Sequence, residues 1–198
     1  MQQLKKISFA GKEIVLGYLP NHVELTFRLL HELNLGMGDL SFSHKIRGRW
    51  ENSYLPIDKV PTVRDIVCPV RDFAVNVFGK KMLALFEPPT GHHHPPFWFN
   101  LSDRGDSTGV HNHAHGSEVS GVYYLEVPID SGDLFFRSDA NEDFSLLPKA
   151  GSVVLFPSDL RHGVRINSSP GKRISLAFNL FAFPLPIFRQ ETFGAEVP

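Results

Sequence analysis

Hydrophobic residues follow a strand-like pattern at the start of the chain and again throughout its second half. "LKKISF" and "EIVLGYL" lie on either side of "AGK", which predicts two strands joined by a turn. From residue 81 onward, short β-branched or aromatic runs recur about every ten residues between Gly, Pro, Asn, Asp and Ser. These runs are "KMLALFEP", "FWFNLS", "SGVYYLEVP", "GDLFFRS", "GSVVLFP", "HGVRIN" and "RISLAFNLFAF". Their spacing predicts an antiparallel sandwich or barrel.

A helix is predicted directly after the first two strands. Asn21 is its expected N-cap, with Glu24 three residues further on, and Gly36 is its expected end. The apolar stripe of this helix is assigned to Phe27, Leu30 and Leu33. Residues 36–58 have no firm periodicity and are expected to form a loop.

A second helical region is predicted from about residue 61 to 79. Ile66, Val70, Phe73 and Val77 share one face of it, which we expect to be buried. Pro69 lies inside this region and predicts a kink or a split, because proline lacks the N–H that a helix interior requires.

The predicted fold class is mainly β: a double-stranded β-helix, of jelly-roll and cupin-like form, with N-terminal helices packed on one sheet. No linker or repeat separates the two halves of the sequence. We therefore expect residues 1–198 to form a single domain. Residues 1–80 would supply a layer of helices and strands, and residues 81–185 a jelly-roll core.

Composition and charge narrow the classes of function. The chain is 42% hydrophobic and 21% charged, with a net charge of −1, so a polyanionic partner such as nucleic acid is not expected. No stretch reaches the roughly 18 uncharged apolar residues of a membrane span. The first residues also lack the apolar core of a signal peptide. We expect a cytoplasmic protein with no nucleic-acid or membrane partner.

Histidines at the edge of one predicted strand are the main candidate for chemistry. In "GVHNHAHGSEVSGVYYL", His111, His113 and His115 alternate and so lie on one side of an extended chain. His162 follows another predicted strand, and Arg173 opens the last long one. One end of a jelly roll can gather side chains from several strands. Three neutral imidazoles there could hold a divalent metal and leave other coordination positions open.

The order of several strand motifs resembles a known family. "HNHAHGSEVSGVYYLEVP", "SGDLFF" and "PKAGSVVLFPSDLRHGVRINSSPGKRISLAFN" are similar to motifs of the Fe(II)- and 2-oxoglutarate-dependent oxygenases. The resemblance covers about residues 97–182 and is strongest to a small bacterial and phage branch with an H-x-H…SGVYYL pattern. It implies an oxidoreductase with Fe(II) and 2-oxoglutarate as cofactors. Such an enzyme would hydroxylate an unactivated C–H bond of an unidentified substrate, with succinate and CO2 as co-products.

The resemblance also implies roles for individual residues. The metal ligands would be His111, His113 and His162, with no catalytic residue beyond the metal centre. Arg173 would bind the far carboxylate of 2-oxoglutarate, together with Ser175 of the R-x-S pattern and Tyr124. Tyr123, one residue earlier, is expected to point to the opposite face of the strand and pack there.

The sequence departs from the superfamily's pattern in two respects. Most members use two histidines and one carboxylate, whereas no carboxylate stands two residues after any candidate histidine here. Three neutral ligands would leave the iron one charge unit more positive. In addition, "HNHAHGS" has one residue more than the family's run. Alignment on "GD" at 105–106 selects His111 and His113, and alignment on "GSEVSG" selects His113 and His115.

Other functions remain open from the residues. "GDSTGVHNHAHGSE" is similar to the first cupin motif and selects His111, His113 and Glu118, while "GSVVLFPSDLRH" resembles the second and adds His162. "RISLAFN" and "SGVYYL" have a role only in the oxygenase. Zinc-activated water for hydrolysis and a non-catalytic jelly-roll binding module are further alternatives.

The expected partners are dioxygen and a small-molecule or peptide substrate. "RGRWENSYLP" carries several groups, among them Glu51 and Asn52, that could contact such a ligand. The apolar "FAFPLPIF" would cover a sheet edge or pack against a second subunit, which favours a homodimer.

Overall fold

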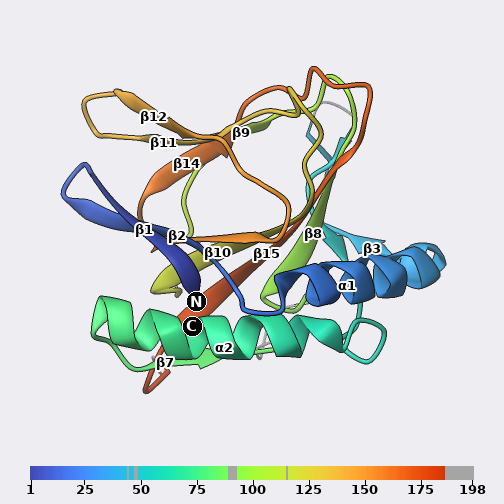
Figure 1. Cartoon of the computed structure of the whole chain (residues 1–198), viewed down its shortest axis with the longest axis horizontal. Coiled ribbons are helices and arrows are strands. Elements are labelled where there is room, and N and C mark those ends of the chain that lie inside the picture. The colour runs from blue at the N-terminus through green and yellow to red at the C-terminus, as the bar shows by residue number, and fades with distance from the viewer. Residues whose placement is uncertain (44, 47–48, 89–92, 115, 186–198) are drawn as a thin grey trace, which may run out of the picture.

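Two facing antiparallel sheets form the body of the molecule, and two helices cover the outer side of the larger sheet (Figure 1). The computed structural model describes residues 1–43, 45–46, 49–88, 93–114 and 116–185. One apolar core lies between the larger sheet and the helices, and a second lies between the two sheets. The predicted arrangement, mainly β with helices packed on one sheet, is therefore present.

The larger sheet contains nine strands. They run in the order β1, β2, β13, β10, β15, β8, β6 and β3, with β7 also pairing with β15. The bounds of these strands are β1 (Gln2–Phe9), β2 (Lys12–Tyr18), β3 (Ser41–Phe42), β6 (Ser53–Tyr54), β7 (Met82–Ala84), β8 (Phe97–Ser102), β10 (Val119–Glu126), β13 (Ser152–Pro157) and β15 (Arg173–Ala182). Because β2 pairs with β13, the two N-terminal strands extend the same sheet that carries the motifs.

The smaller sheet contains four strands in the order β12, β11, β14 and β9. Their bounds are β9 (Thr108–His111), β11 (Leu134–Arg137), β12 (Asp143–Leu146) and β14 (Arg161–Val164). A separate hairpin pairs β4 (Lys45–Ile46) with β5 (Arg49–Trp50). The expectation of a loop over residues 36–58 is thus wrong in part, because the 3-10 helix η1 (Met37–Asp39) and four short strands lie there. No apolar run had predicted β9 or β12.

Neighbouring side chains of the central strand β10 point to opposite faces of the larger sheet. On β10, Tyr124 packs in the core between the sheets, whereas Tyr123 packs in the core under the helices. The hydroxyl of Tyr123 donates to the carbonyl of His22 at 2.8 Å and lies 2.7 Å from Oγ1 of Thr26. The expected packing of Tyr123 on the opposite face is confirmed.

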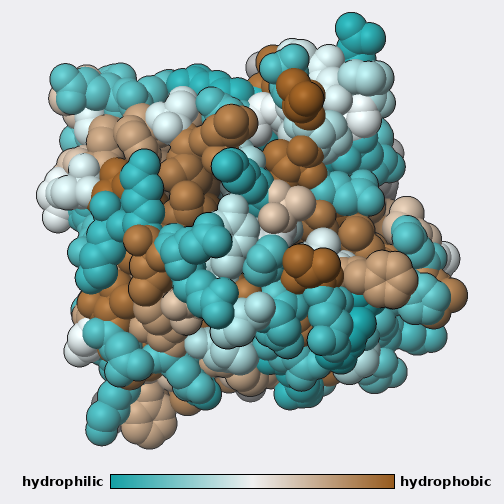
Figure 2. All heavy atoms as spheres, in the orientation of Figure 1, coloured by the Kyte–Doolittle hydropathy of each residue, from teal (hydrophilic) through white to brown (hydrophobic). Residues whose placement is uncertain are grey.

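Helix α1 (His22–Gly36) begins and ends at the predicted residues, but only part of the predicted stripe is buried: Leu33 lies in the core and Leu30 packs partly buried against it. Leu25, Leu29 and Leu33 are buried against the larger sheet. Phe27, which was assigned to the buried stripe, is 73% exposed. Figure 2 shows apolar side chains at the surface over this helix. Asn21 occupies the N-cap position, although its side chain makes no capping hydrogen bond.

Helix α2 (Thr62–Phe78) is one helix with Pro69 inside it, so the predicted split is wrong. Ile66 and Val70 are buried, and the rest of the predicted face packs at the edge of the same core. Glu32 of α1 accepts hydrogen bonds from the N–H (3.1 Å) and the hydroxyl (2.5 Å) of Thr62, which satisfies a donor in the first turn of α2. In the part of the chain that the structure describes, no helix is long and apolar enough to cross a membrane.

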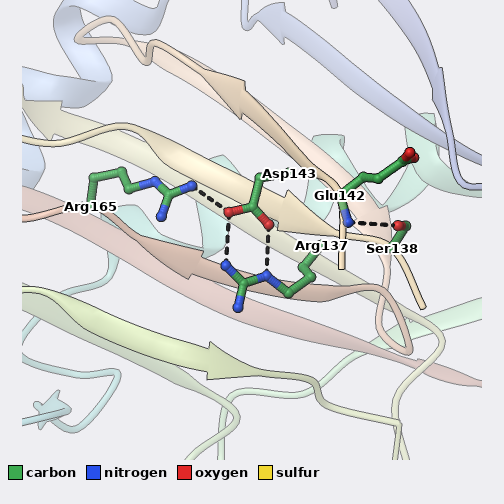
Figure 3. Close-up of polar contacts among 5 residues, drawn as sticks. All are labelled: Arg137, Ser138, Glu142, Asp143 and Arg165. Atoms are coloured by element: carbon green, nitrogen blue, oxygen red, sulfur yellow. Dashed lines mark hydrogen bonds and ion pairs between the residues drawn. The ribbon is translucent and has the colours of Figure 1, made fainter. Parts of the chain in front are cut away.

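A cluster of charged side chains lies on the outer face of the smaller sheet (Figure 3). Arg137 of β11 donates to Asp143 of β12 through Nε at 2.7 Å and Nη2 at 2.8 Å, and Nη2 of Arg165 donates to the same carboxylate. The guanidinium of Arg165 also lies 3.8 Å from the centre of the Phe135 ring. The hydrogen bonds from Arg137 hold the pKa of Asp143 well below its usual range. This cluster joins β11, β12 and the residue directly after β14, on the side away from the core between the sheets.

Candidate functional site

Three histidines from the smaller sheet meet at one point. His111 ends β9, His162 lies on β14, and the two are direct partners across the strands. His113 follows two residues after β9, where its backbone N–H donates to the carbonyl of Ser158 at 2.8 Å. One potential ligand atom from each histidine lies within 4.8 Å of the others. The strand pairing therefore brings His162, about fifty residues away in sequence, to the H-x-H pair.

Backbone carbonyls orient two of the three rings. Nδ1 of His111 lies 2.8 Å from the carbonyl of Gly109, and Nδ1 of His162 lies 2.9 Å from the carbonyl of Leu160. A carbonyl can only accept, so each Nδ1 carries the proton in these hydrogen bonds. The lone pair of each ring then lies on Nε2, as it must in a metal ligand whose other nitrogen is held by the protein.

Burial keeps two of the rings neutral. Burial, with a smaller contribution from the neighbouring His111, lowers the pKa of His113 to about 4 and that of His162 to about 3. Near neutral pH, both side chains are therefore uncharged imidazoles, the form that coordinates a metal.

The donor set fits a divalent transition metal such as iron. Imidazole nitrogen is an ordinary ligand for Fe, Zn, Cu and Ni. Three imidazoles can occupy one face of an ion and leave positions for exogenous ligands, as open catalytic sites require. Among the described residues, this cluster contains no carboxylate or thiolate. The residues that would hold iron here are His111, His113 and His162.

A second polar group lies on the larger sheet, facing the same space. Arg173, at the start of β15, is 2% exposed, and its Nη1 donates to the carbonyls of Ser131 and Gly132, both at 3.0 Å. Ser175 and Tyr124 are direct partners across β15 and β10. Burial raises the pKa of Tyr124, so its hydroxyl stays protonated and can donate.

A cavity of about 390 Å³ joins the two groups. All six residues that the sequence singled out for metal or cosubstrate line it: His111, His113, Tyr124, His162, Arg173 and Ser175. Apolar walls come from both sheets, including Leu134, Phe156, Val164 and Ala177. The cavity is of the size typical of small-ligand sites. It can therefore hold a ligand that contacts the histidines at one end and a guanidinium at the other.

Several lining residues were given no role by the sequence reasoning. Asn100 of β8 is the cross-strand partner of Ser175, and Asn179 of β15 accepts a hydrogen bond from Ser120 at 2.8 Å. The only sequence signal for them is one amide inside an otherwise apolar run, in "FWFNLS" and in "LAFNLF". Glu51 and Asn52 of "RGRWENSYLP" line the cavity as well.

The structure does not assemble the cupin ligand set. Glu118 makes an ion pair with Lys80, whose Nζ lies 2.5 Å from Oε2 of the carboxylate. It does not belong to the group of potential ligand atoms formed by the three histidines. His115, the residue selected by the other alignment register, lies outside the described residues.

Comparison with known proteins places this site in a recognised structural context. A family model described as "Putative 2OG-Fe(II) oxygenase" matches residues 137–179, a stretch that contains His162, Arg173 and Ser175. No curated protein matches the sequence at a significant level.

Solved structures share the fold at low sequence identity. A non-heme alpha-ketoglutarate-dependent carbocyclase, SnoK, from nogalamycin biosynthesis matches with a TM-score of 0.65 and 15% identity, covering 85% of this chain and 79% of that one. A prolyl-4-hydroxylase from Pseudomonas putida matches with a TM-score of 0.58 and 17% identity, covering 85% and 92%. A prolyl hydroxylase from Trichoplax adhaerens, in complex with a hypoxia-inducible-factor peptide, matches with a TM-score of 0.61 and 15% identity, covering 84% and 83%.

These matches confirm the predicted fold class, the double-stranded β-helix. The family model and the neighbours also confirm the resemblance that the motifs had indicated. The matched family consists of oxidoreductases that depend on Fe(II) and 2-oxoglutarate, so these are the cofactors that the match implies.

Proposed function

We propose that this chain, which is similar to the 2-oxoglutarate- and Fe(II)-dependent oxygenases, is a dioxygenase that hydroxylates an unactivated C–H bond. The observation that carries the proposal is a single cavity with a histidine triad at one end and a buried arginine at the other. A dicarboxylate with a metal-chelating end needs this pair of subsites.

At the metal end, His111, His113 and His162 would hold Fe(II), with His111 and His162 offering Nε2. With iron and cosubstrate bound, centres of this class use O2 to convert 2-oxoglutarate to succinate and CO2 and to insert the second oxygen atom into a C–H bond. The protein's contribution is to fix these groups and to exclude water. Fixed ring orientation at His111 and His162 means that binding requires little reorganisation.

At the other end, Arg173 would bind the far carboxylate of 2-oxoglutarate. A guanidinium presents N–H donors in one plane, which suits a carboxylate. Two backbone carbonyls fix this plane. The hydroxyls of Ser175 and Tyr124 would donate to the same carboxylate. The apolar walls formed by Leu134 and Phe156 lower the local dielectric, which strengthens these hydrogen bonds.

The substrate is proposed to be a small molecule or a peptide. Support comes from the neighbours: one is a prolyl hydroxylase in complex with a peptide fragment, and another is a carbocyclase from nogalamycin biosynthesis. We propose hydroxylation as the simplest reaction for this chain. The alternative is another oxidative reaction, such as the ring closure that the name of the carbocyclase neighbour indicates. A cytoplasmic location and a homodimer stay predictions.

Anaerobic titration of the Fe(II)-loaded protein with 2-oxoglutarate tests the proposal. A weak metal-to-ligand absorption band is expected on addition of the keto acid, and succinate is expected once O2 is admitted. Arg173→Ala should weaken 2-oxoglutarate binding by about 100-fold, because it removes a charged hydrogen-bond donor from a buried site. Iron should remain bound in that variant.

The exposed Arg104 offers a matched control, and Arg104→Ala should leave both ligands bound as in the wild type. A wild type that neither binds nor decarboxylates 2-oxoglutarate would contradict the proposal. Zinc-dependent hydrolysis that persists without O2 would instead favour a hydrolase, and a protein that takes up no transition metal would favour a binding module.

A further inference from the structure

A buried asparagine lies at the centre of the segment between β14 and β15. This segment, residues 165–171, precedes Arg173 and meets both the end of β8 and the turn between β10 and β11. Asn167 is 0% exposed and does not line the cavity. A fully buried amide is costly unless its polar atoms find partners, so its contacts indicate what it holds in place.

The side chain of Asn167 joins its own segment to the end of β8. Its Nδ2 donates to the carbonyl of Ser102 at 2.9 Å and to the carbonyl of Gly171 at 3.0 Å. Its Oδ1 accepts from the N–H of Ser169 at 3.0 Å. The hydroxyl of Ser169 in turn accepts from the N–H of Gly171 at 3.1 Å. Every polar atom of the amide therefore has a partner.

These contacts lie directly beside the backbone of Arg173. Ser102, the last residue of β8, is the cross-strand partner of Arg173, and Gly171 precedes Arg173 by two residues. The backbone of Asn167 also pairs with the loop that follows β8, through Gly105 and Asp106, both at 2.8 Å. Asn167 thus fixes the point at which Arg173 enters the sheet.

The 165–171 segment also positions the turn, residues 130–133, that contacts the guanidinium of Arg173. Nη1 of Arg173 donates to the carbonyls of Ser131 and Gly132 in this turn. The turn is attached to the segment by two backbone hydrogen bonds at 2.9 Å: Arg165 N–H to Asp133 O, and Ser168 N–H to Asp130 O.

Glycine is needed where the turn and the segment meet. Gly132 has a φ of +91°, and a Cβ at this position would lie 2.1 Å from the carbonyl oxygen of Arg165. Only glycine accommodates both the backbone conformation and the close approach.

We infer that Asn167 is a positioning residue for Arg173, and that it thereby sets the selectivity of the cavity for a cosubstrate with a distal carboxylate. It acts on the backbone of Arg173 through Ser102 and Gly171. It acts on the guanidinium through the segment that seats the 130–133 turn. The inference rests on the proposed function, because it concerns how 2-oxoglutarate is held.

Two ligands separate positioning from general stability. Pyruvate shares the keto acid end of 2-oxoglutarate and lacks the distal carboxylate, so it would contact the metal end of the cavity without Arg173. A residue that only stabilises the fold changes the affinity for both ligands together. A residue that positions Arg173 changes the affinity for 2-oxoglutarate alone.

The experiment measures the Kd of each ligand for the anaerobic Fe(II)-loaded protein, with melting temperature measured in parallel. Asn167→Asp keeps the size of the side chain and the acceptor for Ser169 but loses both N–H donors. Its Kd for 2-oxoglutarate should rise about ten-fold, the equivalent of roughly one hydrogen bond to a charged group. Its Kd for pyruvate should stay within about two-fold of the wild type.

Two further variants keep the test decisive. Ser169→Ala removes the acceptor for the N–H of Gly171 and should shift the affinity ratio in the same direction by about three-fold. It decides the question if Asn167→Asp does not fold. Thr62→Val removes a buried hydrogen bond at the helices, far from the cavity, and should lower the melting temperature without changing the ratio.

Equal losses for both ligands, or an unchanged 2-oxoglutarate affinity in a folded Asn167→Asp protein, would overturn the inference and leave the proposed function intact. A wild type that binds 2-oxoglutarate no better than pyruvate would contradict the role of Arg173 itself, and the inference would fall with it.

Discussion

Two of the three clustered histidines have a described partner for Nδ1, and in both cases it is a carbonyl two residues earlier in the chain. Gly109 serves His111 in this way, and Leu160 serves His162. The rings are therefore oriented by local backbone, independently of any ion. Three neutral ligands leave the charge of a divalent ion uncompensated by the protein. That charge favours an anionic chelating ligand in the same cavity.

Removing single histidines should distinguish the two alignment registers. His113→Ala is expected to weaken Fe(II) binding by more than about 100-fold, since loss of a direct ligand exceeds the 10–100-fold cost of losing a supporting contact. His111→Ala and His162→Ala should have comparable effects, and His115→Ala should leave the affinity unchanged. Iron content after gel filtration, together with a competition titration, measures this.

His94→Ala is the matched control, because this ring stacks on Tyr54 at 4.1 Å between centroids and lies outside the triad. Strong loss in His115→Ala combined with no effect in His111→Ala would show that the register is wrong by two residues.

Because two of the histidines are buried and neutral, we expect the metal-free protein to lose stability as the pH falls. Burial lowers the pKa of His113 to about 4 and that of His162 to about 3, so the unfolded chain, with ordinary values near 6.5, binds more protons than the native state below that pH. Stability from these groups is fully present above about pH 6.5 and is lost as the pH falls from there through 4 toward 3. Near pH 5 the free energy of unfolding should decrease by roughly 2–3 kcal/mol for each unit that the pH falls, because unfolding takes up nearly two protons.

Urea unfolding in the presence of a chelator, from pH 7 to pH 4.5, measures this slope. His162→Gln removes one of the two groups and should reduce the slope by about half. An identical slope in wild type and variant would mean that His162 is not the group that takes up the proton.

Among the elements, α1 is where the sequence pattern and the packing disagree. The helix has apolar residues on two overlapping stripes, one through Leu25 and Leu29 and the other through Val23 and Phe27. Both satisfy helical spacing, so the pattern alone cannot tell which stripe faces the sheet. The position of the sheet decides, and it buries the leucines.

Substitution on the two stripes should have unequal effects. Leu29→Ala removes a side chain that is 0% exposed and should cost about 2–5 kcal/mol of unfolding free energy. Phe27→Ala should change it by no more than about 0.5 kcal/mol, as expected for an exposed position. Chemical denaturation of both variants measures the difference. A larger loss for Phe27→Ala would restore the stripe that the sequence analysis assigned.

Strands were predicted most accurately where apolar runs are bounded by turn residues. "FWFNLS" coincides with β8, and "RISLAFNLFAF" contains all of β15. β9 and β12 were missed because "TGVH" and "DFSL" carry too few apolar residues; their pairing with β14 and β11 makes them strands. α2 was predicted to kink or split at Pro69, and the structure has one helix that runs through this residue.

The site was predicted to the extent that it lies in short motifs. Tyr124, Arg173 and Ser175 each sit at a recognisable position on a strand, and the structure places them in one cavity with the histidines. Asn100 and Asn167 have no such motif. Their places depend on β8 lying beside β15 and on the 165–171 segment meeting the end of β8, which are long-range contacts.

At the scale of the whole molecule, the cavity lies between the two sheets and is lined by residues of both. The histidines come from the smaller sheet, on β9 and β14, or from the loop directly after β9. Arg173, Ser175 and Tyr124 come from the larger sheet, on β15 and β10. A metal alone would contact only the first group, whereas a chelating dicarboxylate would contact both. Binding of the second ligand should therefore couple the sheets.

This coupling predicts the stability of the ternary complex. A ligand present at 100 times its Kd stabilises the native state by about 2.7 kcal/mol, and each kcal/mol raises the melting temperature of a chain of this size by roughly 2–4 °C. With Fe(II) bound under anaerobic conditions, 2-oxoglutarate should therefore raise the melting temperature by about 5–10 °C. Without a metal, the same concentration should have little effect, because only the Arg173 end can bind.

A melting curve reports the stabilisation of the whole protein, whereas hydrogen exchange shows which strands the ligands stabilise. Fe(II) alone should slow exchange mainly in β9 and β14, and addition of 2-oxoglutarate should extend protection to β8, β10 and β15. Glu118→Gln, which alters an ion pair with Lys80 away from the triad, should reproduce the wild-type pattern. Protection that stays in the smaller sheet after 2-oxoglutarate is added would show that the ligand does not reach Arg173. If 2-oxoglutarate stabilised the protein equally with and without iron, the histidine end of the cavity would take no part in binding 2-oxoglutarate.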